Sequence, residues 1–570
     1  MAASDPRALA SRLAELDDAV LADLFAARHV SSSVSWSDFF DAAEALLDAG
    51  SLARAITALT RAEADALAAG TVPAGEVRDA LVRRALVDAD GVPYDAVRAA
   101  LAATTPAARP AASAPGAADA PSEPDEHAAE QAFAASAALA DILYAAMQTP
   151  LSRIGSGALG ATDRRRLVEI GAAADADEAD EIVAIGERVG FLTAADRLLL
   201  VTADGAAWLR TGTVARWQDV AERLRDALPA ALRTPDGGWM PVAAWTGAHP
   251  FDAAWPAEAQ RLRALLQRWA LFGANGEPAG WAAGLSHGGN ADIAHLQSLL
   301  PPEVDKVFLQ NDLTAIAPGP LQPQLDLRLR AMTRRESRAQ AATYRFTAET
   351  LTAALTAGET ADSLRAFLQE LSLTGLPQPL AYEIERSASR HGALRVGPDW
   401  SGRTRVTADD DALLRTVAVD QALRPLGLVD DGEGLVSRSS ADTVFWMLAD
   451  ARYPVVAVDA DGQRRTLDRH RIADEHTGDA ASTDRYAPLL GRLRSAHDQD
   501  ADTAWLGREL EQAVRARAVI VVTVALPDGS QREFTVEATG IGGGRLRGRD
   551  RAADVERTLP VSSISLVRPA

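Results

Sequence analysis

The chain has 570 residues, with 58 basic and 79 acidic side chains, so its formal net charge at pH 7 is −21. This length predicts several domains, and the absence of cysteine excludes disulfides and thiolate metal sites. Phosphate neutralisation drives most nucleic-acid affinity, so the charge excludes coating of DNA by the whole surface. Any nucleic-acid contact is confined to a local basic face, and the alternative partner for an acidic chain is a basic protein.

The predicted fold is multidomain α+β and mostly helical. The opening residues of the chain form an acidic amphipathic helix rather than a signal peptide, and no apolar run reaches the length of a membrane span, about 18 residues. We therefore expect a cytoplasmic protein. The predicted segments are a helical domain (1–104), a disordered linker (105–127), a winged-helix-like domain (128–228), a helical connector (229–300), an α+β domain (301–463), a second connector (464–514) and a small β-barrel (515–570).

The linker is rich in Pro, Ala and Ser and lacks a periodic apolar face, which is typical of disorder. In the winged-helix-like domain, the helix expected to enter a DNA groove spans residues 177–190. It carries five carboxylates and one arginine, and this charge repels phosphate. We therefore predict a protein-docking or purely structural role for this domain. The sequence GSGALG (155–160) satisfies GxGxxG, but it follows a helical pattern rather than a strand, which argues against a dinucleotide site.

The α+β domain holds the most informative pattern. A strand is predicted over VFLQNDLTAIA (307–317), on which Gln310, Asp312 and Thr314 share one face because alternate side chains of a strand point the same way. Helices at 361–372 and 378–392 and a hairpin at 393–407 then follow in the order of a second winged helix.

This second winged helix carries the first group of candidate nucleic-acid contacts. Arginines suit phosphate binding, and an exposed tryptophan suits base stacking. The alternative is that these side chains are ordinary solvated surface residues, because Glu383 and Glu385 lie on the same helix. The candidates are Arg386 and Arg390 on the helix and Arg395, Trp400, Arg403 and Arg405 on the hairpin.

The C-terminal segment is predicted to be a small five-stranded barrel with a Pro-Asp-Gly turn at 527–529. Arg545, Arg547 and Arg549 share one strand face there and, with Arg551, form a candidate anion-binding patch. The alternative is ordinary surface charge. In the preceding connector, His470, Asp474, Glu475 and His476 fit no metal-ligand spacing, so neither a metal nor a cofactor is expected.

No catalytic motif is found in the sequence. The single lysine, Lys306, follows no glycine-rich loop of the GxxxxGK[ST] kind that nucleotide hydrolysis needs. GLSHGGNADIAH (284–295) lacks the GxSxG nucleophile elbow. We therefore expect a protein that is not an enzyme.

The sequence order LQND, PGP, TYRFT, PQPL and RHG, over about residues 300–460, resembles the N-terminal domain of bacterial XPB-type DNA helicases. It resembles more closely the actinobacterial helicase-associated proteins that carry this domain without a motor. The C-terminal segment is similar to a WYL domain, although VVTVAL (521–526) stands where Trp-Tyr-Leu is expected.

These resemblances imply a non-catalytic accessory or adaptor of helicase-type machinery in DNA repair or transcription. The implied partners are an XPB-like DNA helicase or another repair or transcription protein, with local binding of single-stranded nucleic acid and no membrane. The alternative is a ligand-responsive transcriptional regulator of the WYL type, in which the barrel senses a ligand and a winged helix reads an operator.

Overall fold

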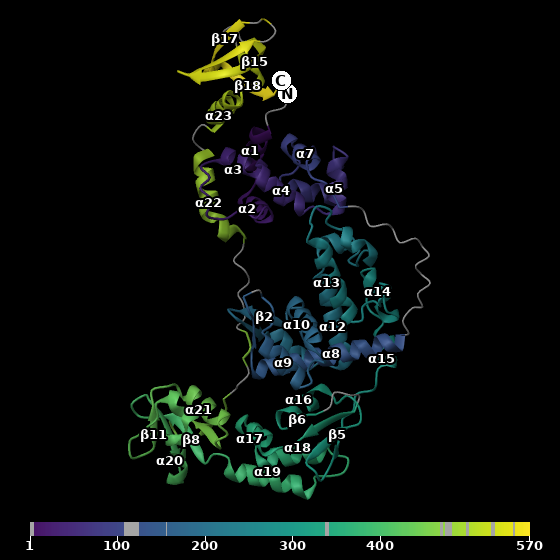
Figure 1. Ribbon diagram of the computed structural model, residues 1–570, viewed down its shortest axis with the longest axis vertical. Coiled ribbons are helices and arrows are strands. Elements are labelled where there is room, and N and C mark those ends of the chain that lie inside the picture. The colour runs from purple at the N-terminus through teal and green to yellow at the C-terminus, as the bar shows by residue number, and fades with distance from the viewer. Residues whose placement is uncertain are drawn as a thin grey trace. The chain divides into compact units, whose positions relative to one another are not determined.

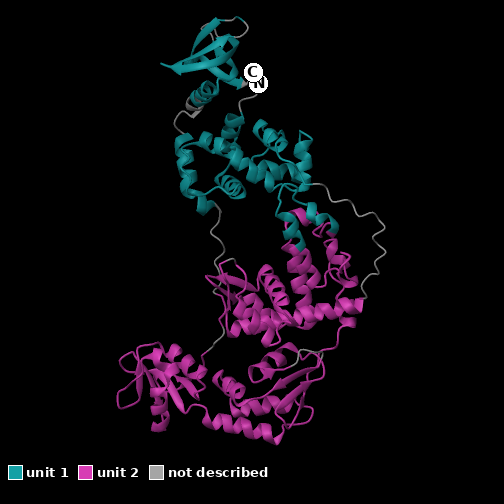
Figure 2. Cartoon of the chain, in the orientation of Figure 1, with its two compact units in different colours: residues 1–114, 243–260, 476–570 teal, residues 115–242, 261–475 magenta. Residues whose placement is uncertain are grey.

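The computed structural model describes residues 5–107, 125–155, 157–336, 341–467, 471–473, 482–497, 501–525, 530–550, 553 and 555–569 (Figure 1). Most of the predicted linker, the predicted turn at 527–529, Arg551, and the group His470, Asp474, Glu475 and His476 lie outside these ranges. The chain divides into unit 1 (1–114, 243–260 and 476–570) and unit 2 (115–242 and 261–475), coloured separately in Figure 2. The described helices and sheets confirm the multidomain α+β prediction.

The N-terminal helices of unit 1 pack around buried aromatic side chains, including Phe25 and Phe39. A helix from the predicted second connector completes this core. Its Tyr486 lies edge-on to Phe25 at 5.9 Å and donates a hydrogen bond to the carbonyl of Val30 at 2.6 Å. The helices are α1 (Asp5–Glu15), α2 (Asp18–Ala27), α3 (Phe39–Leu47), α4 (Ala49–Thr57), α5 (Arg61–Ala68), α6 (Glu76–Arg83), α7 (Asp95–Ala102) and α22 (Ser482–His497).

The C-terminal strands of unit 1 form an open antiparallel sheet in the order β17-β16-β15-β14-β18. Within the described strands β17 and β18 are edges, so the prediction of a closed barrel is wrong. Helix α23 (Ala501–Ala516) covers the apolar face with Leu506 and Leu510, which buries that face without closure. The strands are β14 (Val519–Ala525), β15 (Gln531–Gly542), β16 (Arg545–Asp550), β17 (Val555–Pro560) and β18 (Ile564–Pro569).

Unit 2 begins with a three-stranded sheet, in the order β1-β3-β2, among helices. Three carboxylates of the acidic helix α10 are buried or paired within the protein. Glu178 is buried, Asp180 pairs with Arg164 at 2.7 Å and Glu181 pairs with Arg268 at 2.6 Å. The elements are α8 (Asp125–Gln148), β1 (Leu151–Ser152), α9 (Ala161–Glu169), α10 (Ala176–Arg188), β2 (Leu192–Ala195), β3 (Leu198–Val201), α11 (Ala203–Trp208) and α12 (Thr213–Asp226).

The predicted helical connector at 229–300 contributes to the packing of both units. In unit 2, the indole nitrogens of Trp217 and Trp269 each donate to the other residue's carbonyl, at 2.8 and 3.0 Å. This reciprocal pair satisfies two buried donors. The elements of the segment are η2 (Ala230–Leu232), η3 (Val242–Gly247), α13 (Trp255–Arg268), η4 (Gly280–Ala282), α14 (Ala283–Ser286) and α15 (Ile293–Leu299).

The next part of unit 2 is a four-stranded sheet, in the order β4-β5-β7-β6, covered by helices. The prediction of one continuous strand over 307–317 is wrong, because the chain reverses between β4 and β5. The elements are β4 (Phe308–Leu309), β5 (Thr314–Ala317), α16 (Pro323–Ala331), β6 (Arg334–Arg335), β7 (Ala342–Arg345), α17 (Ala348–Thr356), α18 (Ala361–Leu371) and α19 (Gln378–Arg390).

The reversal is a hairpin whose turn uses the predicted polar motif. Leu313 adopts a left-handed conformation with φ of 64°, and the Gln310 amide donates to the Thr314 carbonyl at 2.9 Å. The Asp312 carboxylate accepts from the Thr314 amide at 3.2 Å and from its hydroxyl at 2.5 Å. A three-residue turn with a left-handed last residue is a common hairpin connection. Gln310, Asp312 and Thr314 therefore meet at a turn instead of lining a strand face.

The last part of unit 2 is a six-stranded sheet, in the order β10-β11-β9-β8-β12-β13, in which β8 and β12 are parallel. Helix α21 packs its buried Val444 and Phe445 into this module's core. The elements are β8 (Leu394–Pro398), β9 (Thr404–Ala408), α20 (Asp411–Val419), η5 (Gln421–Leu426), β10 (Val429–Asp430), β11 (Leu435–Ser437), α21 (Ala441–Asp450), β12 (Val455–Val458) and β13 (Arg464–Arg465).

One glycine turn recurs in both units, at 88–92, 234–238, 273–277, 399–403 and 459–463. In each copy the amide of the first residue donates to the carbonyl of the fifth, at 2.7–3.0 Å. The fourth residue is a glycine with φ between 74° and 88°, a conformation that side chains rarely tolerate.

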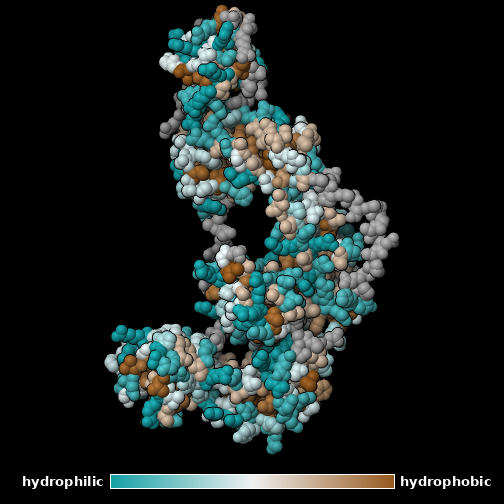
Figure 3. All heavy atoms as spheres, viewed as in Figure 1, coloured by the Kyte–Doolittle hydropathy of each residue, from teal (hydrophilic) through white to brown (hydrophobic). Residues whose placement is uncertain are grey.

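Hydrophobic residues are scattered over the visible face (Figure 3). No described helix has the length and apolarity needed to cross a membrane.

Candidate anion-binding groove

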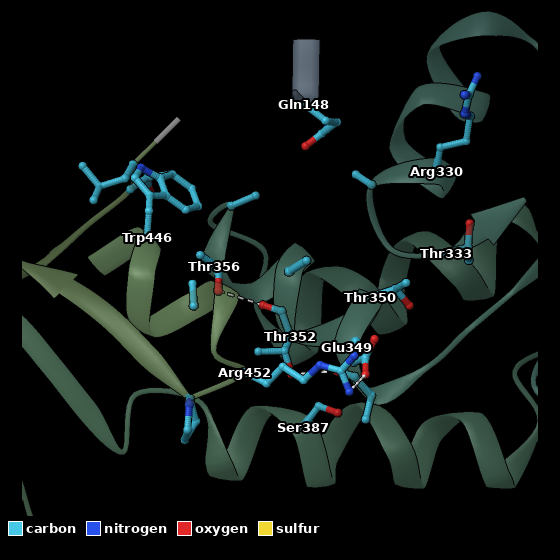
Figure 4. A pocket seen from close by; sticks show the side chains of 18 of the residues that line it. Gln148, Arg330, Thr333, Glu349, Thr350, Thr352, Thr356, Ser387, Trp446 and Arg452 are labelled. Carbon is cyan, nitrogen blue, oxygen red and sulfur yellow. Dashed lines mark hydrogen bonds and ion pairs between the residues drawn. The ribbon is translucent and has the colours of Figure 1, made fainter. Parts of the chain in front are cut away.

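Unit 2 contains a groove with a volume of about 890 Å³. Its walls come from the end of α8, from α11 and the residues after it, and from α16, α17, α19 and α21 (Figure 4). The volume lies within the range of ligand-binding clefts, about 300–1,000 Å³. It is therefore the natural place to ask what the fold can bind.

The groove is locally cationic. Arg386 and Arg390 lie one turn apart on α19, so both project from one face of that helix, and Arg210 and Arg452 approach from the residues that follow α11 and α21. With Arg330 the lining holds five arginines against two carboxylates, Glu349 and Glu383, a net of +3. Because the chain as a whole is strongly acidic, this lining has the sign expected of a local anion site.

The arginines differ in how far they are engaged. Arg452 pairs with Glu349 at 2.8 Å, and Arg386 lies 3.4 Å from Glu383. Arg390 is exposed and forms no ion pair with another residue that the structure describes. Arg452 and Glu349 are both exposed, and ion pairs between exposed side chains are weak, about 0–1 kcal/mol, so a phosphate can replace Glu349 at little cost. Arg386 and Arg390 are therefore the best-placed donors for an anion.

Threonines and a tryptophan also line the groove. The hydroxyls of Thr352 and Thr356, on α17, donate to the carbonyls of Ala348 and Thr352 at 2.7 and 2.9 Å. Their protons are thus already used, so these two hydroxyls do not donate to a ligand. Trp446, on α21, is half-buried and offers a ring surface to a base or another planar group.

A buried ion network forms part of the groove wall and ties α8 to α16. Asp141 accepts from Arg330 at 2.8 Å and from Arg335 at 3.0 Å, and the Arg330 guanidinium lies 4.2 Å from the centre of the Tyr144 ring. Burial alone would lower the pKa of Arg330, but the nearby carboxylates Asp141 and Asp326 outweigh burial and raise that pKa. Arg330 is thus a structural cation with its partners already in place.

The predicted contacts on the β8–β9 hairpin do not line the groove. All three of its arginines are paired with carboxylates: Arg395 with Asp409 at 2.8 Å, Arg403 with Asp399 at 3.0 Å, and Arg405 with Asp431 at 2.8 Å. Trp400, at the tip of the hairpin, is 88% exposed. A nucleic-acid role for these four residues stays a prediction, and for the arginines it requires replacing a carboxylate that is already bound.

The predicted patch on β16 belongs to unit 1, and its three arginines share the exposed face of that strand. Across the sheet, Arg545 lies opposite Gly542 and Pro560, and Arg547 lies opposite Gly540 and Thr558. Arg549 lies between two carboxylates, Glu537 and Glu556. Since a side chain at Gly540 or Gly542 would meet nothing within 4 Å, the half of this face at Arg545 and Arg547 is open to an anion.

The remaining predicted motif, Gln310, Asp312 and Thr314, lies at the β4–β5 turn and outside the groove. The hydrogen bond from the Thr314 side chain is the largest influence on Asp312 and lowers the pKa of its carboxyl. This geometry is that of a structural turn.

Sequence reasoning named Arg386 and Arg390 because they lie on the helix of the predicted second winged helix, but it missed Arg210, Trp446 and Arg452. No local pattern marks these three residues. They meet α19 only through the tertiary fold, and Arg210 is more than 170 residues away from Arg386 in the chain.

Comparison with known proteins identifies one domain. Residues 307–430 match a family described as "Helicase conserved C-terminal domain", and no curated protein matches the chain. The matched segment contains α17, α19 and the β8–β9 hairpin, so it supplies Arg386 and Arg390 to the groove. This match supports a helicase-associated protein.

Proposed function

We propose that this protein is a non-catalytic accessory of DNA helicase-type machinery that holds a single-stranded nucleic-acid segment in the groove of unit 2. The observation that carries the proposal is that the helicase-type domain contributes Arg386 and Arg390 to a cationic groove in an acidic chain. Phosphate neutralisation by arginine supplies the affinity, and it is local because the chain as a whole is acidic.

A single strand suits this groove better than a duplex. A single strand exposes its bases, which can stack on Trp446 while its phosphates meet the arginines. A duplex hides its base faces and presents mainly edges and backbone. The groove contains an aromatic wall and guanidinium donors, which are the two elements that single-strand binding combines.

The non-catalytic part of the proposal rests on Lys306. Its ammonium group donates to the carbonyl of Glu370 at 2.8 Å, and no glycine-rich phosphate loop precedes it in the sequence. The resemblance to XPB-type N-terminal domains and to actinobacterial helicase-associated proteins favours an XPB-like helicase, or another repair or transcription protein, as the partner that supplies the motor.

A ligand-responsive regulator of the WYL type is the second candidate. The open face at Arg545 and Arg547 supports it, because a sensing domain needs an accessible anion site. An operator-reading protein is expected to bind one duplex sequence as a dimer, whereas the accessory binds single strands without sequence preference. Binding to duplex and single-stranded oligonucleotides separates the two.

The test of the groove is a salt titration of oligothymidylate binding, followed by fluorescence anisotropy. Each single-strand phosphate contact adds about 0.7 to the salt slope, so changing both Arg386→Gln and Arg390→Gln should lower the slope by about 1.4. Arg365→Gln, on α18 outside the groove and already paired with Asp362 and Glu385, is the matched control and should leave the slope unchanged. Equal affinity and slope in the wild type and the double variant would refute the groove as the site.

A further inference from the structure

Trp400 is 88% exposed, which places it among the most exposed large hydrophobic side chains that the structure describes. It is the second residue of the glycine turn at 399–403, between β8 and β9, and it does not line the groove. Tryptophan is enriched at interfaces, because its large apolar ring carries one polar N–H group, so an exposed indole at a loop tip is a candidate contact for a partner.

The turn itself does not require tryptophan. The same turn at 88–92, 234–238, 273–277 and 459–463 carries Ala89, Pro235, Ala274 and Ala460 at the equivalent position. With a smaller side chain at the second position, these copies form the same hydrogen bond and hold the glycine in the same left-handed conformation. The indole of Trp400 is therefore an addition to the turn, and its role lies outside the turn.

The turn that presents Trp400 is firmly held by Asp399, whose side chain is fully buried. One Asp399 oxygen accepts from the Ser401 amide, the Ser401 hydroxyl and the Arg403 amide, at 2.7–2.9 Å, and the other accepts from the Arg403 side chain at 3.0 Å. Burial would raise the pKa of Asp399, but these hydrogen bonds outweigh it and lower the pKa to about 2. An ordered turn presents its indole at little entropic cost on binding.

The charges around the tip favour a cationic occupant over a phosphate. The hairpin arginines already hold carboxylates, and in the Arg405 network the guanidinium is 15% exposed while Glu433 is 81% exposed. Residues 394–440 contain eight carboxylates and six arginines, a net of −2. A phosphate must displace bound carboxylates, whereas an incoming guanidinium meets the face of an indole and Glu433, which stays 81% exposed while it lies 3.6 Å from Arg405.

We propose that the Trp400 tip is a docking point for a basic segment of a protein partner, with an arginine of that segment lying over the indole and its charge balanced by Glu433. Arginine stacks on aromatic faces and pairs with carboxylates through the same planar group. The inference goes beyond nucleic-acid binding in the groove and stands even if the groove binds nothing, because no residue is shared between the two sites.

The test uses the full chain and a fluorescein-labelled decapeptide of alternating arginine and glycine as the probe. A cation–π contact at an exposed site is worth a factor of about two to five in affinity, so Trp400→Ala should weaken peptide binding by that factor and Trp400→Phe by less. Adding the peptide should also shift the indole NMR signal that is missing from the Trp400→Phe variant.

A matched pair of variants separates docking from the general attraction of an acidic chain for a basic peptide. Glu433→Gln and Asp461→Asn each remove one exposed negative charge, the second on the equivalent turn at 459–463, and only Glu433→Gln should weaken binding beyond the common charge effect. Unchanged peptide affinity in Trp400→Ala would overturn the inference. The inference would also be overturned if Trp400→Ala lost oligothymidylate binding and kept peptide binding. Trp400 would then be a platform for base stacking.

Discussion

The buried carboxylate of Asp141 should be indispensable to unit 2. Its side chain is 7% exposed and faces the guanidiniums of Arg330 and Arg335, which are 11% and 20% exposed. Asp141→Ala removes the carboxylate that Arg330 and Arg335 share, and breaking a buried ion pair in this way costs about 3–5 kcal/mol. The predicted loss lies toward the lower end of that range, because Arg330 keeps Asp326 at 3.7 Å and Arg335 is 20% exposed.

Urea unfolding followed by tryptophan fluorescence measures this loss, with hydrogen exchange in α8 and α16 locating it in unit 2. A chain of several domains need not unfold in one step, so the local readout decides the result. Asp362→Ala is the matched control, since Asp362 is 89% exposed and its pair with Arg365 should contribute at most about 1 kcal/mol. The reasoning is refuted if Asp141→Ala destabilises unit 2 no more than Asp362→Ala does.

Three further predictions concern pH, catalysis and the β16 face. Burial, and then Arg464, lower the pKa of His391 from 6.5 to about 4. As the pH falls, the unfolded chain takes up a proton at this residue before the folded chain does, so the free energy of unfolding should decrease by up to about 3 kcal/mol between pH 6.5 and 4. A His391→Gln variant that keeps the same pH dependence would contradict this. The protein should release no phosphate from ATP, with or without single-stranded DNA, and DNA-stimulated release abolished by Lys306→Ala would show otherwise. Oligothymidylate or heparin binding should weaken more in Arg545→Gln or Arg547→Gln than in Arg549→Gln, because two glutamates flank Arg549; an equal effect of all three would remove the distinction.

The sequence predicts helices well where the signal is local. Arg386 and Arg390 lie on a helix predicted at 378–392, which the structure has as α19 (Gln378–Arg390), and their binding of an anion stays a prediction. The segment at 307–317 was misread because alternation of polar and apolar residues is the same in one strand as in two short strands joined by a turn. Only the left-handed conformation of Leu313 distinguishes them, and leucine gives no sign of it.

Other features depend on contacts distant in sequence. The partner of Arg405 is Asp431, 26 residues away, so the sequence of the hairpin alone does not show that this arginine is already paired with a carboxylate. The alternating pattern of the C-terminal strands predicts one apolar face, but it does not predict whether the sheet closes into a barrel or a helix covers that face. In the structure, Leu506 and Leu510 of α23 cover it. His391 is buried, although it directly follows Arg390 in the sequence.

Ultraviolet cross-linking of a 5-iododeoxyuridine-substituted single strand to the full chain, followed by mapping of the linked peptides, tests the central claim most directly. A strand held in the groove of unit 2 should cross-link to Trp446 or Tyr453, which line it, and the Arg386→Gln, Arg390→Gln double variant should lose these cross-links. Cross-links confined to the β16 face or to the Trp400 tip, with none in peptides that line the groove, would contradict the account.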